Sequence, residues 1–121
     1  MERIYLNELE NRVGIKLLRN DHRFAYIIGR FPDGLEPELK LVALFDEKHH
    51  FVDEKEMTIY NEDSIRETKD YESIGLIVFR RSAKQWEENK EQIIQEFQTL
   101  ISQLSEQNKE IISSENLSCK V

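Results

Sequence analysis

Two adjacent histidines flanked by carboxylates form the part of the sequence that is richest in groups able to bind a metal or move a proton. His49 and His50 follow Asp46 and precede Asp53 and Glu54. Imidazole and carboxylate both bind divalent metals, and histidine also titrates near neutral pH. Adjacent side chains of a strand point to opposite faces, so these histidines can share one ion only if the chain turns there. We therefore expect a solvated loop, with no metal-ligating and no catalytic residues.

The other reactive side chains give no sign of catalysis or of a cofactor. The sequence has no glycine-rich phosphate-binding motif and no Gly-x-Ser-x-Gly nucleophile motif. Cys119, the single cysteine, falls among the last residues, where nothing fixes the electropositive surroundings that a reactive thiol needs. His22 lies between Asp21 and Arg23 in an expected turn. These features favour a protein that is not an enzyme and that uses no cofactor.

A set of arginines could form a cationic surface on a chain that is otherwise acidic. Residues 1–40 contain seven basic and seven acidic side chains, whereas the rest of the chain is predominantly acidic. If the arginines converge beside an aromatic side chain, they could bind single-stranded RNA through phosphate contacts and base stacking. Otherwise they pair with carboxylates on neighbouring strands. The residues of this candidate surface are Arg19, Arg23, Tyr26, Arg30, Arg80 and Arg81.

Runs of β-branched and aromatic residues predict the strands that would carry these side chains. The sequence Phe31-Pro32-Asp33-Gly34 has turn chemistry, and the apolar runs before and after it predict a hairpin. The N-terminal residues 3–19 fit either a helix or a strand, and we take 12–19 as a strand. The expected strands are 12–19, 23–31, 38–46, 56–60 and 73–81.

A long helix is predicted directly after the last of these strands. Ser82 and Gln85 have the spacing of a capping box, and apolar residues then recur at intervals of three, four and seven. This pattern covers residues 83–108, and residues 113–121 lack it and are expected to form a flexible tail. Residues 1–112 then form a single α+β domain. Its curved, mainly antiparallel sheet of about five strands, or partial barrel, packs against the C-terminal helix.

Apolar residues on both sides of the expected strands are the observation that bears most on function. A sheet with one face in water should alternate apolar and polar residues, and these strands do not. The long helix can cover one face, whereas the other is covered either by the rest of the chain or by another protein or a second copy. The helix stripe also resembles a short heptad seam. It gives the candidate partner-binding residues Trp86, Phe97 and Leu104.

The composition of the chain limits its environment and its partners. The 121 residues contain 17 basic and 24 acidic side chains, for a formal charge of −7, and 39% of the residues are hydrophobic. No apolar run approaches the length of a membrane span, so we expect a cytoplasmic protein without a membrane partner. The predicted function is a non-enzymatic binding or regulatory role through contacts with another protein or within a homodimer. The alternative is an RNA-binding regulator that uses the arginines.

Overall fold

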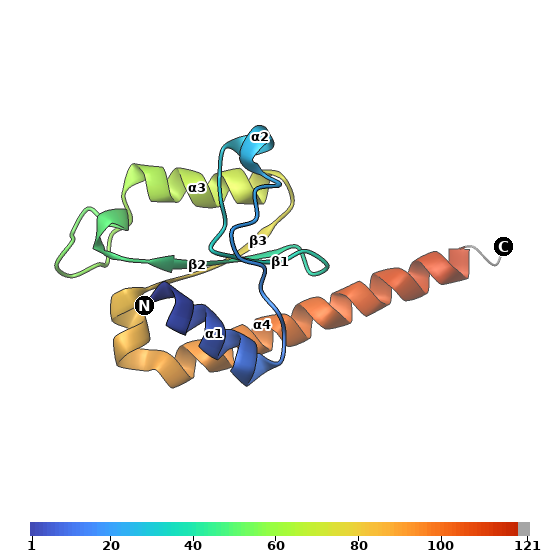
Figure 1. The fold of residues 1–121 in the computed structure, drawn as a ribbon. Helices are drawn as coiled ribbons and strands as arrows, with labels where there is room; N and C mark the ends of the chain where they lie inside the picture. Colours follow the sequence, from blue (N-terminus) through green and yellow to red (C-terminus); the bar gives the residue numbers. More distant parts are fainter. Residues whose placement is uncertain (119–121) are drawn as a thin grey trace.

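A three-stranded mixed sheet lies between two layers of helices in the computed structural model (Figure 1). The structure describes residues 1–118, and the side chains of residues 1–108. The strands are β1 (Gly34–Glu36), β2 (Leu41–Asp46) and β3 (Ile77–Ser82), in the order β1-β2-β3. β1 is antiparallel to β2, and β2 is parallel to β3. The class is therefore α+β as expected, but the sheet is open, has three strands and is not mainly antiparallel.

The helices of the two layers come from distant parts of the chain. Helices α1 (Glu2–Val13) and α4 (Ala83–Ser118) lie on one face of the sheet, and α3 (Glu62–Ser73) lies on the other (Figure 1). Two short helices complete the fold: α2 (Ala25–Ile28) and the 3₁₀ helix η1 (Lys48–His50). α3 forms the crossover between the parallel strands β2 and β3, which is the usual way to connect such a pair.

Every residue of β2 is buried, because helices cover the sheet on both faces. Leu41, Ala43 and Phe45 pack towards α1 and α4, whereas Val42 and Leu44 belong to the cluster on the α3 side. A continuous apolar run is typical of a strand that is covered in this way. The expectation that both faces need a cover is confirmed, and the chain itself supplies it.

Two expected strands are wrong because their segments pack elsewhere. Residues 12–19 contain the end of α1 and only a single bridge from Leu18 to Leu35. Residues 23–31 contain α2, whose apolar residues Tyr26 and Ile27 are exposed instead of packing in a sheet. Phe24 and Ile28 alone of this segment reach the cluster on the α3 side, so the segment covers that layer at one end. The expected hairpin of 23–31 with 38–45 is wrong: β1 pairs with β2 instead, and residues 37–40 connect these two strands.

The remaining boundaries differ in ways that follow from the same packing. Residues 56–60 contribute only the bridge between Phe51 and Tyr60, not a strand. The strands expected at 38–46 and 73–81 are confirmed. β2 lies within the first range, and β3 begins inside the second and ends one residue after it. α4 continues to Ser118, well beyond residue 108, and it takes in residues 113–118 of the expected tail; residues 119–121 lie outside the described part of the chain.

The capping box at the start of α4 is confirmed. The Gln85 backbone N–H donates to Ser82 Oγ at 3.0 Å, and the Gln85 side chain accepts from the Ser82 backbone N–H at 2.9 Å. α4 bends a turn later at Asn89, whose φ of −137° and ψ of 40° are not helical. This bend separates residues 83–88, whose Trp86 packs against Tyr5 of α1, from the longer part of α4 that continues along α1 and the sheet.

Replacing the N-cap residue of α3 is expected to weaken this crossover helix. Asn61 accepts a hydrogen bond from the Ser64 backbone N–H at 2.9 Å. Loss of such a cap costs about 1 kcal/mol of stability. We therefore expect Asn61→Ala to lower the free energy of unfolding in urea by about this amount, whereas Asn11→Ala, at an exposed position inside α1, should not lower it. Equal values for the two variants would contradict a capping role.

Candidate functional site

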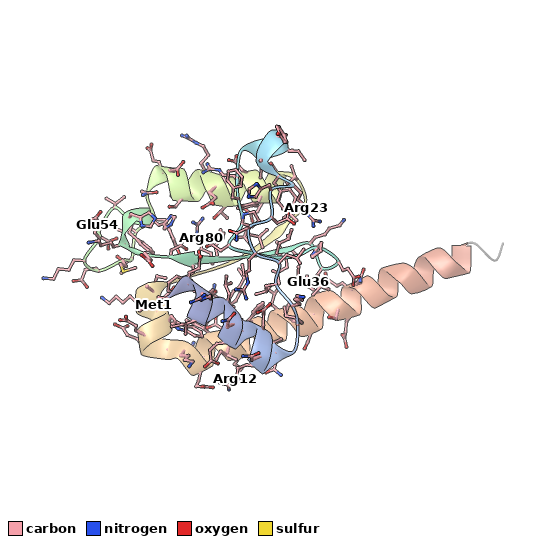
Figure 2. The ribbon with its side chains drawn as sticks, in the orientation of Figure 1. Met1, Arg12, Arg23, Glu36, Glu54 and Arg80 are labelled. Carbon is pink, nitrogen blue, oxygen red and sulfur yellow. The ribbon has the colours of Figure 1, made fainter. Side chains whose placement is uncertain are left out.

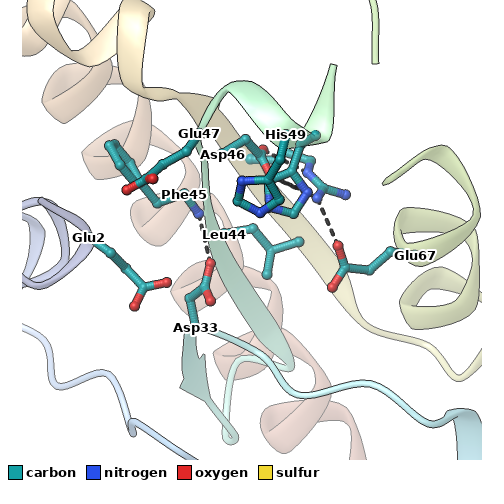
Figure 3. A pocket seen from close by; sticks show the side chains of 10 residues that line it. Glu2, Asp33, Leu44, Phe45, Asp46, Glu47, His49 and Glu67 are labelled. Carbon is teal, nitrogen blue, oxygen red and sulfur yellow. Dashed lines mark hydrogen bonds and ion pairs between the residues drawn. The ribbon is translucent and has the colours of Figure 1, made fainter. Parts of the chain in front are cut away.

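A pocket of about 330 Å³ lies where β2 ends and η1 begins. β2 and β3 are parallel and end together at Asp46 and Ser82. Ligands of sheets with parallel strands commonly bind beyond the carboxyl ends of those strands. Figure 3 shows Glu2 and Asp33 on one side of the pocket, Glu67 on the opposite side, and imidazoles near the end of β2. Its walls are formed by Glu2, Asp33, Leu44, Phe45, Asp46, Glu47, His49, His50, Glu67 and Arg80.

Two carboxyl groups from distant parts of the chain face each other in this pocket. Glu2 is the first residue of α1, and Asp33 stands just before β1 (Figure 3). Asp33 is held in place because its Oδ2 accepts a hydrogen bond of 2.9 Å from the Phe45 backbone N–H. Burial and a hydrogen bond with Glu2 raise the pKa of Asp33 from 3.8 to about 8. At neutral pH this pair therefore holds a proton.

Arg80 lines the pocket, and all of its hydrogen-bond donors are occupied. Arg80 donates to both carboxylate oxygens of Asp46, at 2.7 and 2.8 Å, and to Glu67 at 2.7 Å. Its remaining N–H groups donate to Ser64 O and Thr68 Oγ1, each at 2.8 Å. All five N–H donors of the guanidinium are thus engaged, and Asp46 is 1% exposed. The network fixes the end of β2 against α3.

The two histidines both line the pocket, which the sequence could not show. They lie on η1, and their ring centroids are 4.1 Å apart. His50 Nδ1 is 3.1 Å from Ser64 Oγ and 3.6 Å from Asp46 Oδ1. These two contacts fix the orientation of the imidazole ring. Burial lowers the pKa of His50, which keeps the imidazole neutral near pH 7. With its proton on Nδ1, the ring presents a basic Nε2.

The carboxylates that flank the histidines in sequence separate in the structure. Asp46 belongs to the pocket, whereas Asp53 accepts hydrogen bonds from Thr58 and the backbone of Ile59. Among the described residues, no group of three or more His, Cys, Asp and Glu side chains is arranged to hold a metal ion. Glu2 and Asp33 could offer a cation two carboxylates, which is fewer than such a group contains.

The arginines expected to bind RNA are each paired with acidic side chains. Figure 2 shows Arg80 between the sheet and α3, and Arg23 near α2. Tyr26, the aromatic residue of the set, is fully exposed on α2. Because carboxylates neutralise the guanidinium charges, the set does not present a free cationic surface. The pairs are Arg19–Glu10, Arg23–Asp21, Arg30–Asp63, Arg30–Asp70, Arg80–Asp46, Arg80–Glu67 and Arg81–Glu96.

The residues expected to bind a protein partner lie inside the chain. Trp86 is 6% exposed, Phe97 is fully buried, and Leu104 is 7% exposed. All three belong to the cluster between the sheet, α1 and α4. Trp86 packs edge-on against Tyr5 of α1, with ring centroids 5.0 Å apart. Their apolar stripe is therefore the core side of α4 and not a surface available to another protein.

Several pocket residues, among them Glu2, Asp33 and Glu67, had no functional role in the sequence analysis. Asp33 was noticed only as part of a turn, and Glu2 and Glu67 were not singled out. The sequence offered one signal for the pocket: Asp33 directly precedes β1, and Asp46 is the last residue of β2. Nothing in that pattern shows that α1 brings Glu2 to the same place, because α1 reaches it by packing on α4.

Comparison of the chain with protein-family models, with curated proteins and with solved structures found no match. Within the described residues, no helix combines the length and the apolar character that crossing a membrane requires.

Proposed function

We propose that this protein is an enzyme that hydrolyses phosphodiester bonds in the pocket at the end of β2, assisted by one divalent cation. The observation that supports it is the pair of facing carboxyl groups, Glu2 and Asp33, in the same pocket as the imidazole of His50. This proposal takes the place of the non-enzymatic binding role expected from the sequence.

The need for a cation follows from the two carboxyl groups. Carboxylates placed side by side repel each other unless a proton or a cation lies between them. Mg²⁺ is commonly held by only one or two carboxylates, and water and substrate phosphate oxygens complete its octahedron. The pocket fits this kind of site better than a site made only of protein ligands. A bound cation would polarise the phosphoryl oxygen and offset the charge that develops during the reaction.

The charge of the pocket favours a diester over a monoester. A phosphate monoester carries close to two negative charges near neutral pH, and enzymes usually hold such groups with arginine or lysine. Arg80 is the only cationic side chain among the lining residues, apart from the histidines, and its N–H groups are all engaged. A diester carries one negative charge, which a single divalent cation can accommodate. DNA and RNA are the abundant substrates of this class.

His50 is placed to activate the attacking water. Ser64 and Asp46 lie at its Nδ1, which leaves Nε2 to accept a proton. General-base catalysis by a positioned histidine commonly contributes 100-fold or more. Glu47 and His49 also line the pocket, but His49 is exposed and no described side chain bonds to its ring.

The test is cleavage by the purified protein of single- and double-stranded DNA and RNA, and of bis(p-nitrophenyl) phosphate, with Mg²⁺, Mn²⁺ or EDTA. We expect cleavage that requires a divalent cation. His50→Gln should lower the rate about 100-fold and flatten its rise with pH. His22→Gln is the matched control, because His22 packs on Phe31 outside the pocket. An absence of cation-dependent cleavage on every substrate, or equal rates for the two variants, would overturn the proposal.

A further inference from the structure

The outer edge of β3 has no neighbouring strand in the described part of the chain. β3 is the last strand of the sheet, and its six residues include neither proline nor lysine. Such an edge presents rows of backbone donors and acceptors, and proteins usually protect it or use it for pairing. A feature of this kind can therefore bind another strand.

The register with β2 identifies which backbone groups of β3 point outwards. The Ile77 N–H donates to Lys40 O at 2.8 Å, so Ile77, Phe79 and Arg81 face β2 and the alternate residues face away. Two outward groups already have partners: Arg80 O accepts from the Arg81 guanidinium, and the Ser82 N–H donates to Gln85. Within the described residues, the N–H and C=O of Val78 and the N–H of Arg80 have none.

We propose that β3 pairs with β3 of a second copy of this chain, antiparallel and centred on Phe79, to form one six-stranded sheet. The outward residues Val78 and Arg80 lie at equal distances on either side of Phe79. A two-fold axis there places Val78 opposite Arg80 of the partner subunit, and each such pair exchanges two backbone hydrogen bonds. Every free edge group then gains a partner, once the Arg81 side chain releases Arg80 O.

The surface beside the edge supports a second copy as the occupant. An open groove of about 620 Å³ follows β3 and α4. Its charged members, Arg81 and Glu96, pair with each other at 2.7 Å, so two copies with a formal charge of −7 can approach here without local repulsion. Ile77 is 36% exposed at one end of the edge, and the two-fold axis would place it opposite Arg81 of the partner subunit.

The test measures the molar mass of the purified protein by size-exclusion chromatography with light scattering at micromolar concentration. We expect twice the 14.5 kDa of one chain. Ile77→Lys places a like charge opposite Arg81 of the partner subunit at two symmetric positions, and it should weaken dimerisation at least about tenfold. Ile77→Glu, which places the opposite charge there, should preserve the dimer. Ile59→Lys changes an exposed isoleucine away from β3 and should also preserve it.

A second variant tests the backbone pairing itself. Val78→Pro removes an N–H that points away from β2, and proline is tolerated at such edge positions. It should yield a folded monomer, verified by circular dichroism. A monomeric wild type, or a dimer that tolerates Ile77→Lys as well as Ile77→Glu, would overturn the proposal. If Val78→Pro does not fold, the two Ile77 variants decide the question alone.

Discussion

Asp33→Asn is expected to abolish phosphodiester hydrolysis while making the protein more stable at alkaline pH. Asparagine keeps the shape of the side chain and an oxygen for the Phe45 N–H, but it cannot offer a negative charge to a cation. The cation supplies several kcal/mol of transition-state stabilisation, so its loss should lower the rate by about 1000-fold. Mg²⁺ should raise the melting temperature of the wild type and leave that of Asp33→Asn unchanged.

The expected gain in stability follows from the pKa of Asp33. In the folded protein without a cation this pKa is raised from 3.8 to about 8, so between these values the folded chain holds a proton that the unfolded chain releases. The stability of the wild type should therefore fall as the pH rises from about 4 to about 8. Asparagine does not titrate, so the variant should lack this decline and should exceed the wild type most clearly near pH 8.

Thermal unfolding in EDTA at pH 4, 6 and 8 measures this effect, and the same samples with Mg²⁺ measure cation binding. Asp63→Asn is the matched control, because its carboxylate is exposed and outside the pocket. A variant that loses stability at pH 8 would contradict the raised pKa. A variant that keeps its hydrolytic rate would contradict the role of Asp33 in the reaction.

Arg80→Ala is expected to give the largest loss of stability of any substitution considered. It removes five hydrogen bonds and leaves Asp46 buried without its counter-charge. Breaking a buried pair in this way costs about 3–5 kcal/mol. That is a large part of the stability of a small domain. Urea unfolding should show a much lower midpoint, or an unfolded protein.

The adjacent arginine provides a control within the same strand. Arg81 pairs with the partly exposed Glu96, and pairs of that kind contribute up to about 1 kcal/mol. Arg81→Ala should therefore move the urea midpoint much less than Arg80→Ala. Combining Arg80→Met with Asp46→Asn removes the uncompensated charge and should recover part of the loss. Equal effects of the two single variants would show that the network around Arg80 is not specially important.

How well the sequence predicted each element depended on how locally that element is determined. β2 and the start of α4 were predicted because their signals lie within a few residues: a continuous apolar run, and the Ser82–Gln85 box. α3 was missed because it is largely polar and buries only Ser64 and Tyr71. The apolar composition of 23–31 favoured a strand, but no neighbour in the sheet is available to that segment, and it folds as α2.

The candidate site was harder to predict than the fold because its residues meet only through tertiary packing. The histidines were singled out, but η1 turns the chain so that both line one pocket, which a strand would prevent. Asp33 stood out as a turn residue, and its closeness to Glu2 depends on where α1 docks. Several arginine pairs are also tertiary, since Arg30 and Asp70 are forty positions apart, whereas the Arg23–Asp21 pair is local.

The docking of α1 on α4 sets the order in which the chain can complete its fold during synthesis. Glu8 pairs with Lys90, and Arg12 with Glu91, so α1 has its partner about eighty residues later in the chain. Until α4 has left the ribosome, α1 and β2 can pack on each other, with Tyr5 against Phe45, but the apolar surface that they share with α4 has no cover. Nascent chains that stop before Leu104 are therefore expected to expose this surface and to be substrates for chaperones.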